Sequence, residues 1–147
     1  MLDVQVKPIS NRAFEMMGNV EGNFQRGIRQ GWYRIGDQLS AQLSDDVLSK
    51  NKTGRTYIRR IKGGARRRHR ASAPGESPAN RTGQYRRSRG YEIRGWQQLE
   101  FGVRADHGIF LEEGTKNMAP RPGVQNAVEK RQNIIPPTLE GSIGAEF

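Results

Sequence analysis

The most regular pattern of apolar positions lies between about residues 20 and 48, where apolar side chains recur every three or four residues. In chain order they are Phe24, Ile28, Trp32, Ile35, Leu39, Leu43 and Val47. This spacing places them on one face of an α-helix, and the opposite face is polar and mixed in charge. Gly27, Gly31 and Gly36 lie in the same stretch, and each costs about 1 kcal/mol relative to alanine in a helix interior. Packing must therefore hold this helix, and we expect its stripe to cover a sheet.

Shorter patterns flank the helix on both sides. Residues 2–7 alternate apolar and polar side chains and predict a short strand. A brief helical turn capped by Ser10 or Asn11 is expected to follow and to end at Gly18. After the long helix, residues 53–61 predict a strand, which the glycine pair at 63–64 ends.

Residues 65–80 are poor in apolar side chains and rich in Arg, Ser, Pro and Gly, which predicts a long loop. Beyond it, a turn at Gly95 and Trp96 separates two stretches of alternating apolar residues. The alternating residues are Tyr91 and Ile93 before the turn, and Leu99, Phe101 and Val103 after it. This pattern is typical of an antiparallel β-hairpin.

The next stretch reads as a rigid elbow between two helices. Residues 106–113 predict a short helix, and Gly114 stands where the chain needs a residue that tolerates positive φ. Pro120 and Pro122 hold the next segment extended, and Pro122 is well placed to begin a helix that reaches about residue 132. Residues 136–137, both proline, are expected to interrupt the chain. The C-terminal tail is residues 133–147, and its last part, residues 138–147, is expected to be either a short docked helix or a frayed end.

Together these elements predict one α+β domain over residues 1–147. A small antiparallel β-sheet packs under a long N-terminal α-helix, with a long basic hairpin arm and a C-terminal helix. Residues 62–82 form the extended basic loop of that arm. Because only 33% of the chain is hydrophobic and it contains 18 glycines, the core must be thin. A thin core favours a protein that completes its burial against partners.

The net charge of +10 belongs to one segment. Residues 52–94 hold 14 lysines and arginines against two acids, a net charge of +12, whereas the rest of the chain has a net charge of −2. No apolar run approaches the roughly 18 residues of a membrane span, and residues 1–10 lack the apolar core of a signal peptide. We therefore expect a protein made in the cytoplasm, without a membrane partner.

Catalytic and metal-binding patterns are weak, so we expect neither an enzyme nor a cofactor. The chain has no cysteine and two histidines, His69 and His107, which are far apart and lack the paired spacing of metal ligands. Adjacent carboxylates such as Glu112 and Glu113 point about 100° apart on a helix, which does not suit an acid–base pair. No phosphate-binding loop or dinucleotide motif occurs.

The basic segment is the strongest candidate for a binding surface. Tyr57, Tyr85 and Tyr91 are interleaved with its arginines, an arrangement that suits polyanions. Its candidate contact residues are Arg59, Arg60, Arg66, Arg67, Arg68, Arg70, Arg86, Arg87 and Arg89. A small nucleic-acid-binding module would show the same basicity, but no readout motif is present. The alternative is that this segment is a solvated basic loop without a binding role.

The order of motifs from residue 80 to about residue 130 resembles the tail-completion (head–tail joining) proteins of long-tailed bacteriophages. That pattern runs Thr-Gly, Ser, two strands, an aromatic-plus-Glu helix, Gly-Thr-x-x-Met-x-x-Arg-Pro and a last helix. The matching residues are Thr82, Gly83, Ser88, Phe110, Glu113, Gly114, Thr115, Met118, Arg121 and Pro122. The chain departs from the pattern at Tyr85, where an aliphatic residue is more usual, and at Gly123, where a bulky residue is more usual.

The resemblance implies a virion structural protein of the phage neck. It would form a homo-oligomeric ring, with six subunits as first choice and twelve as second, around the channel through which DNA leaves. Its partners would be the head-proximal connector or adaptor and the tail terminator or tail tube. The basic arm would either line the channel beside DNA or grip an acidic surface on a neighbouring ring.

The elbow is expected to serve as scaffold. We expect Glu112 or Glu113 to pair with Arg121 and to pin the two sides of the turn. The elbow residues are Glu112, Glu113, Gly114, Thr115, Met118, Arg121 and Pro122.

Overall fold

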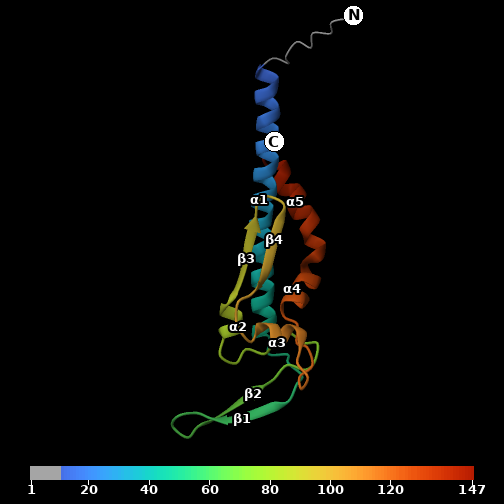
Figure 1. Cartoon of the computed structure of the whole chain (residues 1–147). Helices are drawn as coiled ribbons and strands as arrows, with labels where there is room; N and C mark the ends of the chain where they lie inside the picture. Colours follow the sequence, from blue (N-terminus) through green and yellow to red (C-terminus); the bar gives the residue numbers. More distant parts are fainter. Residues whose placement is uncertain (1–10) are drawn as a thin grey trace, which may run out of the picture.

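One helix, α1 (Asn11–Leu48), forms the long axis of the molecule (Figure 1). The computed structural model describes residues 11–147, with side chains from residue 18 onward. The strand expected at residues 2–7 lies outside the described residues. The expected break at Gly18 is wrong, because α1 continues through it. Glycine keeps its backbone N–H and costs about 1 kcal/mol in a helix, so it weakens a helix without having to end it.

Two separate antiparallel hairpins make up the β structure, and the overall class is α+β as expected. The first hairpin pairs β1 (Thr56–Arg60) with β2 (Arg66–Arg70). The second pairs β3 (Arg89–Arg94) with β4 (Gln98–Val103), as the alternation predicted. The second hairpin lies along α1, whereas the first projects from the end of the body where α1 ends (Figure 1).

Four short helices and one 3-10 turn complete the chain. They are α2 (Gln84–Arg87), α3 (Gly108–Glu113), α4 (Val124–Arg131), η1 (Gln132–Ile134) and α5 (Ile135–Gly144). Helices α4 and α5 run back along α1, antiparallel to it (Figure 1). The tail expected at residues 133–147 is thus a docked helix over most of its length. Its two prolines do not interrupt it, because they lie in the first turn of α5, where their missing N–H groups have no helical partner.

The glycines of α1 allow close approach on two sides of the helix. A Cβ at Gly27 would lie 2.7 Å from the Ile143 Cα, so α5 can come this near only because the side chain is absent. Gly36 is nine residues further along, half a turn round the helix at 100° per residue. A Cβ there would lie 2.6 Å from the ring of Tyr91 on β3. These contacts account for two of the helix-weakening glycines, Gly27 and Gly36.

The core is thin, as the composition suggested. The buried apolar residues of the described chain are Ile35, Leu39, Leu43, Val47, Tyr85 and Ala127. Half-buried side chains from β4, α3 and α4 complete it, namely Phe101, Val103, Leu111 and Val124. This core lies near the C-terminal end of α1, close to the root of the projecting hairpin. No helix within residues 11–147 is both long and apolar enough to cross a membrane.

Candidate functional site

The projecting hairpin, β1–β2, is the basic arm of the molecule. Its strands pair from Thr56 opposite Arg70 to Arg60 opposite Arg66, and Gly63 and Gly64 turn the chain with φ of 106° and 82°. Nine of its ten strand residues are exposed, and the tenth, His69, is half-buried. The arm is shorter and more regular than expected, because the arginine run that the sequence suggested was a loop is the return strand.

The two faces of the arm differ in their surroundings. Residues directly opposite each other on paired strands point to the same side. Tyr57, Arg59, Arg67 and His69 therefore share the inner face, and the first two and His69 line a cleft against the body. The outer face carries the remaining strand side chains, Thr56, Ile58, Arg60, Arg66, Arg68 and Arg70. The arm therefore turns a strongly basic face away from the molecule.

Three of the nine candidate arginines do not belong to the arm. Arg86 and Arg87 lie in α2, and Arg89 begins β3. Arg89 Nη1 donates to the carbonyl of Arg86 over 2.8 Å, and Arg87 Nη2 donates to the carbonyl of Thr82 over 3.0 Å. Arg89 thus braces the turn between α2 and β3, and Arg87 holds the segment that leads into α2. The grouping of all nine into one arm is wrong, because the chain returns to the body after Arg70.

The root of the arm is clamped by two charged side chains. Lys52 is buried, and its Nζ donates to the carbonyls of Asp46 at 2.8 Å and Ser77 at 2.7 Å. Burial lowers the pKa of Lys52, while the charges of Glu76 and Asp46 oppose that shift. The Glu76 carboxylate accepts hydrogen bonds from the Thr53 hydroxyl and from the backbone N–H groups of Thr53 and Ala73. These bonds, led by the Thr53 hydroxyl, lower the pKa of Glu76.

Residues 71–83 connect the arm back to the body, and they are packed against it. Ser72, Ser77 and Pro78 are buried, although the sequence predicted a long basic loop over residues 62–82. The prediction missed this packing because serine and proline give no apolar periodicity. The basic loop is confined to the short turn at residues 61–65.

The elbow is held by a different contact from the one expected. One oxygen of Glu112 accepts a hydrogen bond from the Tyr85 hydroxyl and from the N–H groups of Gly123, at 2.9 Å, and Val124, at 3.0 Å. Helix α4 begins at Val124, two residues after Pro122, so this carboxylate caps the helix's N-terminus. Neither Glu112 nor Glu113 forms an ion pair with Arg121, and that expected pairing is wrong.

Other elbow residues behave as the sequence predicted. Gly114 ends α3 with φ of 80°, and a Cβ there would lie 2.7 Å from the Met118 carbonyl oxygen. Thr115 and Met118 exchange backbone hydrogen bonds of 2.8 and 3.1 Å across the bend. The Arg121 N–H donates to the Leu111 carbonyl over 2.7 Å, which closes the elbow onto α3.

Tyr85 and Gly123, the two departures from the phage pattern, lie in contact with each other. A Cβ on Gly123 would overlap the Tyr85 hydroxyl and lie 3.1 Å from its ring. The tyrosine therefore occupies the space that a bulkier residue at position 123 would need. Burial, and then the hydrogen bond to Glu112, raise the pKa of Tyr85 far above its ordinary value.

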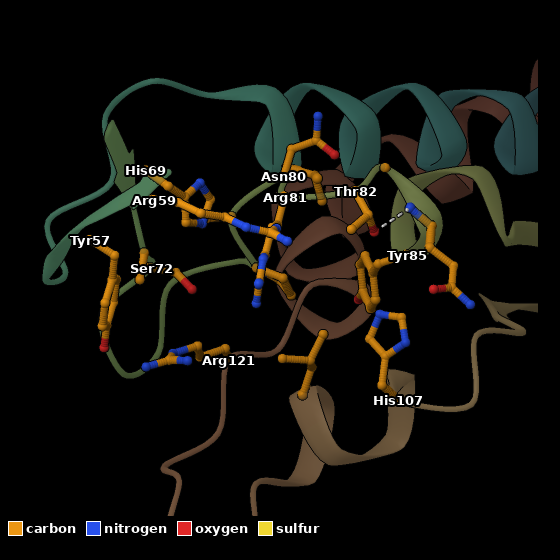
Figure 2. Close-up of a pocket in the computed structure, with 17 residues that line it drawn as sticks. Tyr57, Arg59, His69, Ser72, Asn80, Arg81, Thr82, Tyr85, His107 and Arg121 are labelled. Carbon is orange, nitrogen blue, oxygen red and sulfur yellow. Dashed lines mark hydrogen bonds between the residues drawn. The ribbon is translucent and has the colours of Figure 1, made fainter. Parts of the chain in front are cut away.

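A cleft of about 900 Å³ lies between the inner face of the arm and the body (Figure 2). Its apolar wall is built from Val47, Pro78, the Tyr85 ring and Leu111. Three guanidinium groups also line it: Figure 2 shows Arg59 coming from the arm and Arg81 and Arg121 from the body. None of the residues that line the cleft is acidic. The cleft combines an apolar wall with uncompensated positive charge.

The arginines of the cleft have few partners of their own. Within the described residues, Arg59 and Arg81 form neither an ion pair nor a side-chain hydrogen bond. The Arg121 Nε is buried without a hydrogen-bond partner, and its Nη1 lies 3.6 Å from the Met118 sulfur. Sequence reasoning missed Arg81 and the clamp residue Lys52, because isolated basic residues carry no local signal. Among residues 18–147, whose side chains the structure describes, no group of three or more His, Asp or Glu side chains could hold a metal ion.

Comparison of the chain with protein-family models, with curated proteins and with solved structures found no match.

Proposed function

We propose that this chain is a structural subunit of a bacteriophage neck, which assembles into a ring between the head connector and the tail tube. The ring would surround the DNA exit channel, with six subunits as first choice and twelve as second. The protein would be made in the bacterial cytoplasm and end in the virion. The motif order from Thr82 to Pro122 is the basis for the family assignment.

The observation that carries the proposal is the exposed arm. Tyr57, Ile58 and Ile61 of the arm are 52%, 62% and 46% exposed. A two-stranded hairpin without a third strand or a helix on its face is marginally stable in water. A large apolar and basic surface on such an element is most useful where another subunit covers it. An assembly protein therefore accounts for the arm better than a free-standing enzyme does.

The elbow supports the family assignment in a second way. The pattern's Gly-Thr-x-x-Met segment corresponds to a bend whose glycine needs positive φ and whose threonine and methionine pair with each other. The two departures, Tyr85 and Gly123, offset one another in volume.

The test is the assembly state of the purified full-length chain, followed by its effect on particle assembly. Native mass spectrometry and negative-stain electron microscopy should show a closed ring. Replacing Arg66, Arg67, Arg68 and Arg70 with serine should leave rings intact and stop heads from joining tails, if the arm clamps a neighbouring ring. Normal joining with altered DNA retention would instead place the arm in the channel. A chain that stays monomeric at high concentration contradicts the proposal.

A nucleic-acid-binding module is the second candidate, and the outer face of the arm favours it. That face carries four arginines without an acidic neighbour on either strand. Such a face would neutralise phosphates, and its affinity for DNA would fall steeply with salt. Fluorescence anisotropy with labelled DNA at 50 and 200 mM salt separates the two functions. Tight, salt-sensitive binding by a monomer would favour this candidate.

A further inference from the structure

Helix α3 has one side that lines the cleft and another that is exposed to solvent. His107 and Leu111, one turn apart, face the cleft. Ile109 and Phe110 point elsewhere and are 57% and 55% exposed. Because successive helix residues turn by 100°, Glu113 lies on the same side as these two, one turn further on. Glu113 is also exposed. This side of α3, Ile109, Phe110 and Glu113, is called the α3 knob below.

We propose that the α3 knob of one subunit fills the cleft of the next, so that this contact builds the ring proposed above. The inference deepens the proposed function and rests on it. The apolar wall of the cleft would receive Phe110 and Ile109. The Glu113 carboxylate would meet the guanidinium groups of Arg59, Arg81 and Arg121.

Charge supports this occupant. The cleft holds three arginines and no acid, and the knob carries an unpaired carboxylate next to two apolar side chains. Planar guanidinium groups suit paired contacts with carboxylates. The residues that contribute most to binding between proteins are often aromatic residues and arginines near the centre of the interface. The proposed contact has this composition.

The geometry also supports assembly in one direction. The knob and the cleft are different surfaces of the same subunit, separated by the thickness of α3. A contact between two different surfaces is head-to-tail, and it closes into a ring when the rotation between subunits permits. The same helix would then join two interfaces, one through each of its faces.

Nucleic acid fits the cleft less well than a peptide segment does. Bases stack on free aromatic faces. The Arg55 guanidinium already lies 5.7 Å from the centre of the Tyr57 ring, which covers one face of that ring. The Tyr85 ring is only 6% exposed, and its hydroxyl is bonded to Glu112. Neither tyrosine offers a stacking platform comparable to the apolar wall.

The test uses two single variants of the full-length chain, one for each surface. Phe110→Ser damages the knob, and Arg81→Glu damages the cleft. Both positions are exposed, so far-ultraviolet circular dichroism should match the unmodified chain. Thermal melting should match it when both are measured at a concentration where the unmodified chain is monomeric, because assembly itself raises the melting temperature. Each variant should raise the dissociation constant of the oligomer at least tenfold in sedimentation velocity, because a central contact is lost.

Mixing the two variants gives the sharper result. A head-to-tail contact leaves Phe110→Ser with an intact cleft and Arg81→Glu with an intact knob. An equimolar mixture should therefore form a heterodimer that cannot close into a ring. A mixture that stays monomeric while the unmodified chain forms rings overturns the contact.

Two control variants change an exposed apolar residue and an exposed arginine that lie outside the knob and the cleft. Val20→Ser removes an apolar side chain of similar exposure, 54%, and Arg60→Glu reverses a charge on the outer face of the arm. Both should form rings.

Rings that survive Phe110→Ser and Arg81→Glu overturn this contact but leave the proposed function standing. Loss of single-stranded DNA binding by Arg81→Glu, with rings intact, overturns the peptide occupant. An unmodified chain that stays monomeric removes both proposals.

Discussion

The two hairpins have the same antiparallel geometry but different sources of order. In β3–β4, Tyr91 and Phe101 pair across the strands, and Phe101 and Val103 join the core beneath α1. In β1–β2, every strand residue but one is exposed. The body hairpin is stabilised by burial within its own chain. Within its own chain, the arm depends on its backbone ladder and its root clamp.

If the chain assembles as proposed, this difference would let it divide folding from assembly. Residues that stabilise the subunit are concentrated around the end of α1, and the basic and apolar residues of the arm contribute little there. Substitutions on the arm could therefore alter a proposed contact without endangering the fold. Substitutions in the two hairpins should accordingly have unequal effects.

The largest effect is expected from truncating the body hairpin. Phe101→Ala should lower the free energy of unfolding by about 3 kcal/mol, because it removes a large side chain packed against the core. Ile58→Ala on the arm should change it by less than about 0.5 kcal/mol, since Ile58 is mostly exposed. Urea denaturation of both variants measures the difference. Equal losses would mean that the arm is part of the folding unit.

The next effect concerns the cap of α4, which ties the body together near the arm. Glu112→Ala should cost about 2 kcal/mol, because a tyrosine hydroxyl and two helix N–H groups lose their acceptor. Glu113→Ala is the control, and it should cost little because that side chain is exposed. Thermal melts at a concentration where the chain is monomeric decide between them, because Glu113 also belongs to the proposed contact between subunits. Arg121→Ala should also lower the free energy of unfolding only slightly. A loss as large as that of Glu112→Ala would support the ion pair that the sequence predicted between Arg121 and a glutamate.

Volume at the elbow gives a smaller effect. Gly123→Ala should destabilise the body by about 1–2 kcal/mol, because its new methyl group meets the Tyr85 side chain. Adding Tyr85→Leu should remove part of that loss by freeing the space. Gly90→Ala, where a Cβ meets nothing within 4 Å, is the matched control. If the double variant loses as much stability as Gly123→Ala and Tyr85→Leu lose together, the two positions do not compensate for each other.

Acid should loosen the root of the arm before it unfolds the body. The pKa of Glu76 in the folded chain lies below its ordinary value of 4.5. Its stabilisation is therefore present above pH 4.5 and is lost as pH falls through the lowered pKa. Amide hydrogen exchange at Thr53 and Ala73 should accelerate in acid, while exchange in β3–β4 should not. Glu76→Gln, which costs about 1 kcal/mol, should remove this pH dependence.

The smallest effect is at the alkaline end, on the body hairpin alone. Burial, and then the hydrogen bond to Asp37, raise the pKa of Tyr91 to about 12. Because the folded value exceeds the unfolded value of 10.0, this stabilisation is complete below pH 10 and is lost as pH rises toward 12. Ultraviolet titration should show one tyrosine ionising near pH 12, and Tyr91→Phe should abolish that step. An unchanged titration curve would place Tyr91 away from Asp37.

Sequence patterns predicted the elements that have an apolar period of their own. The stripe of α1 and the alternation in β3–β4 both depend on side chains that the core buries. Strand β2 has no such period, because four of its five residues are arginine, and only its pairing with β1 makes it extended. The sequence predicted the backbone course of the elbow but not the contacts of its side chains. Glu112 lies nearer to the unpaired N–H groups of α4 than to Arg121, so the helix end competes successfully for its charge.

The clamp at Lys52 has a mechanical consequence. Its ammonium group joins the last turn of α1, through the Asp46 carbonyl, to the segment that leaves the arm, through the Ser77 carbonyl. A force applied to the tip of the arm would therefore act on the end of α1. With 38 residues, α1 is about 57 Å long at 1.5 Å per residue. Because β3, β4, α4 and α5 pack along this helix, a force on the arm would pass through the clamp to the whole body.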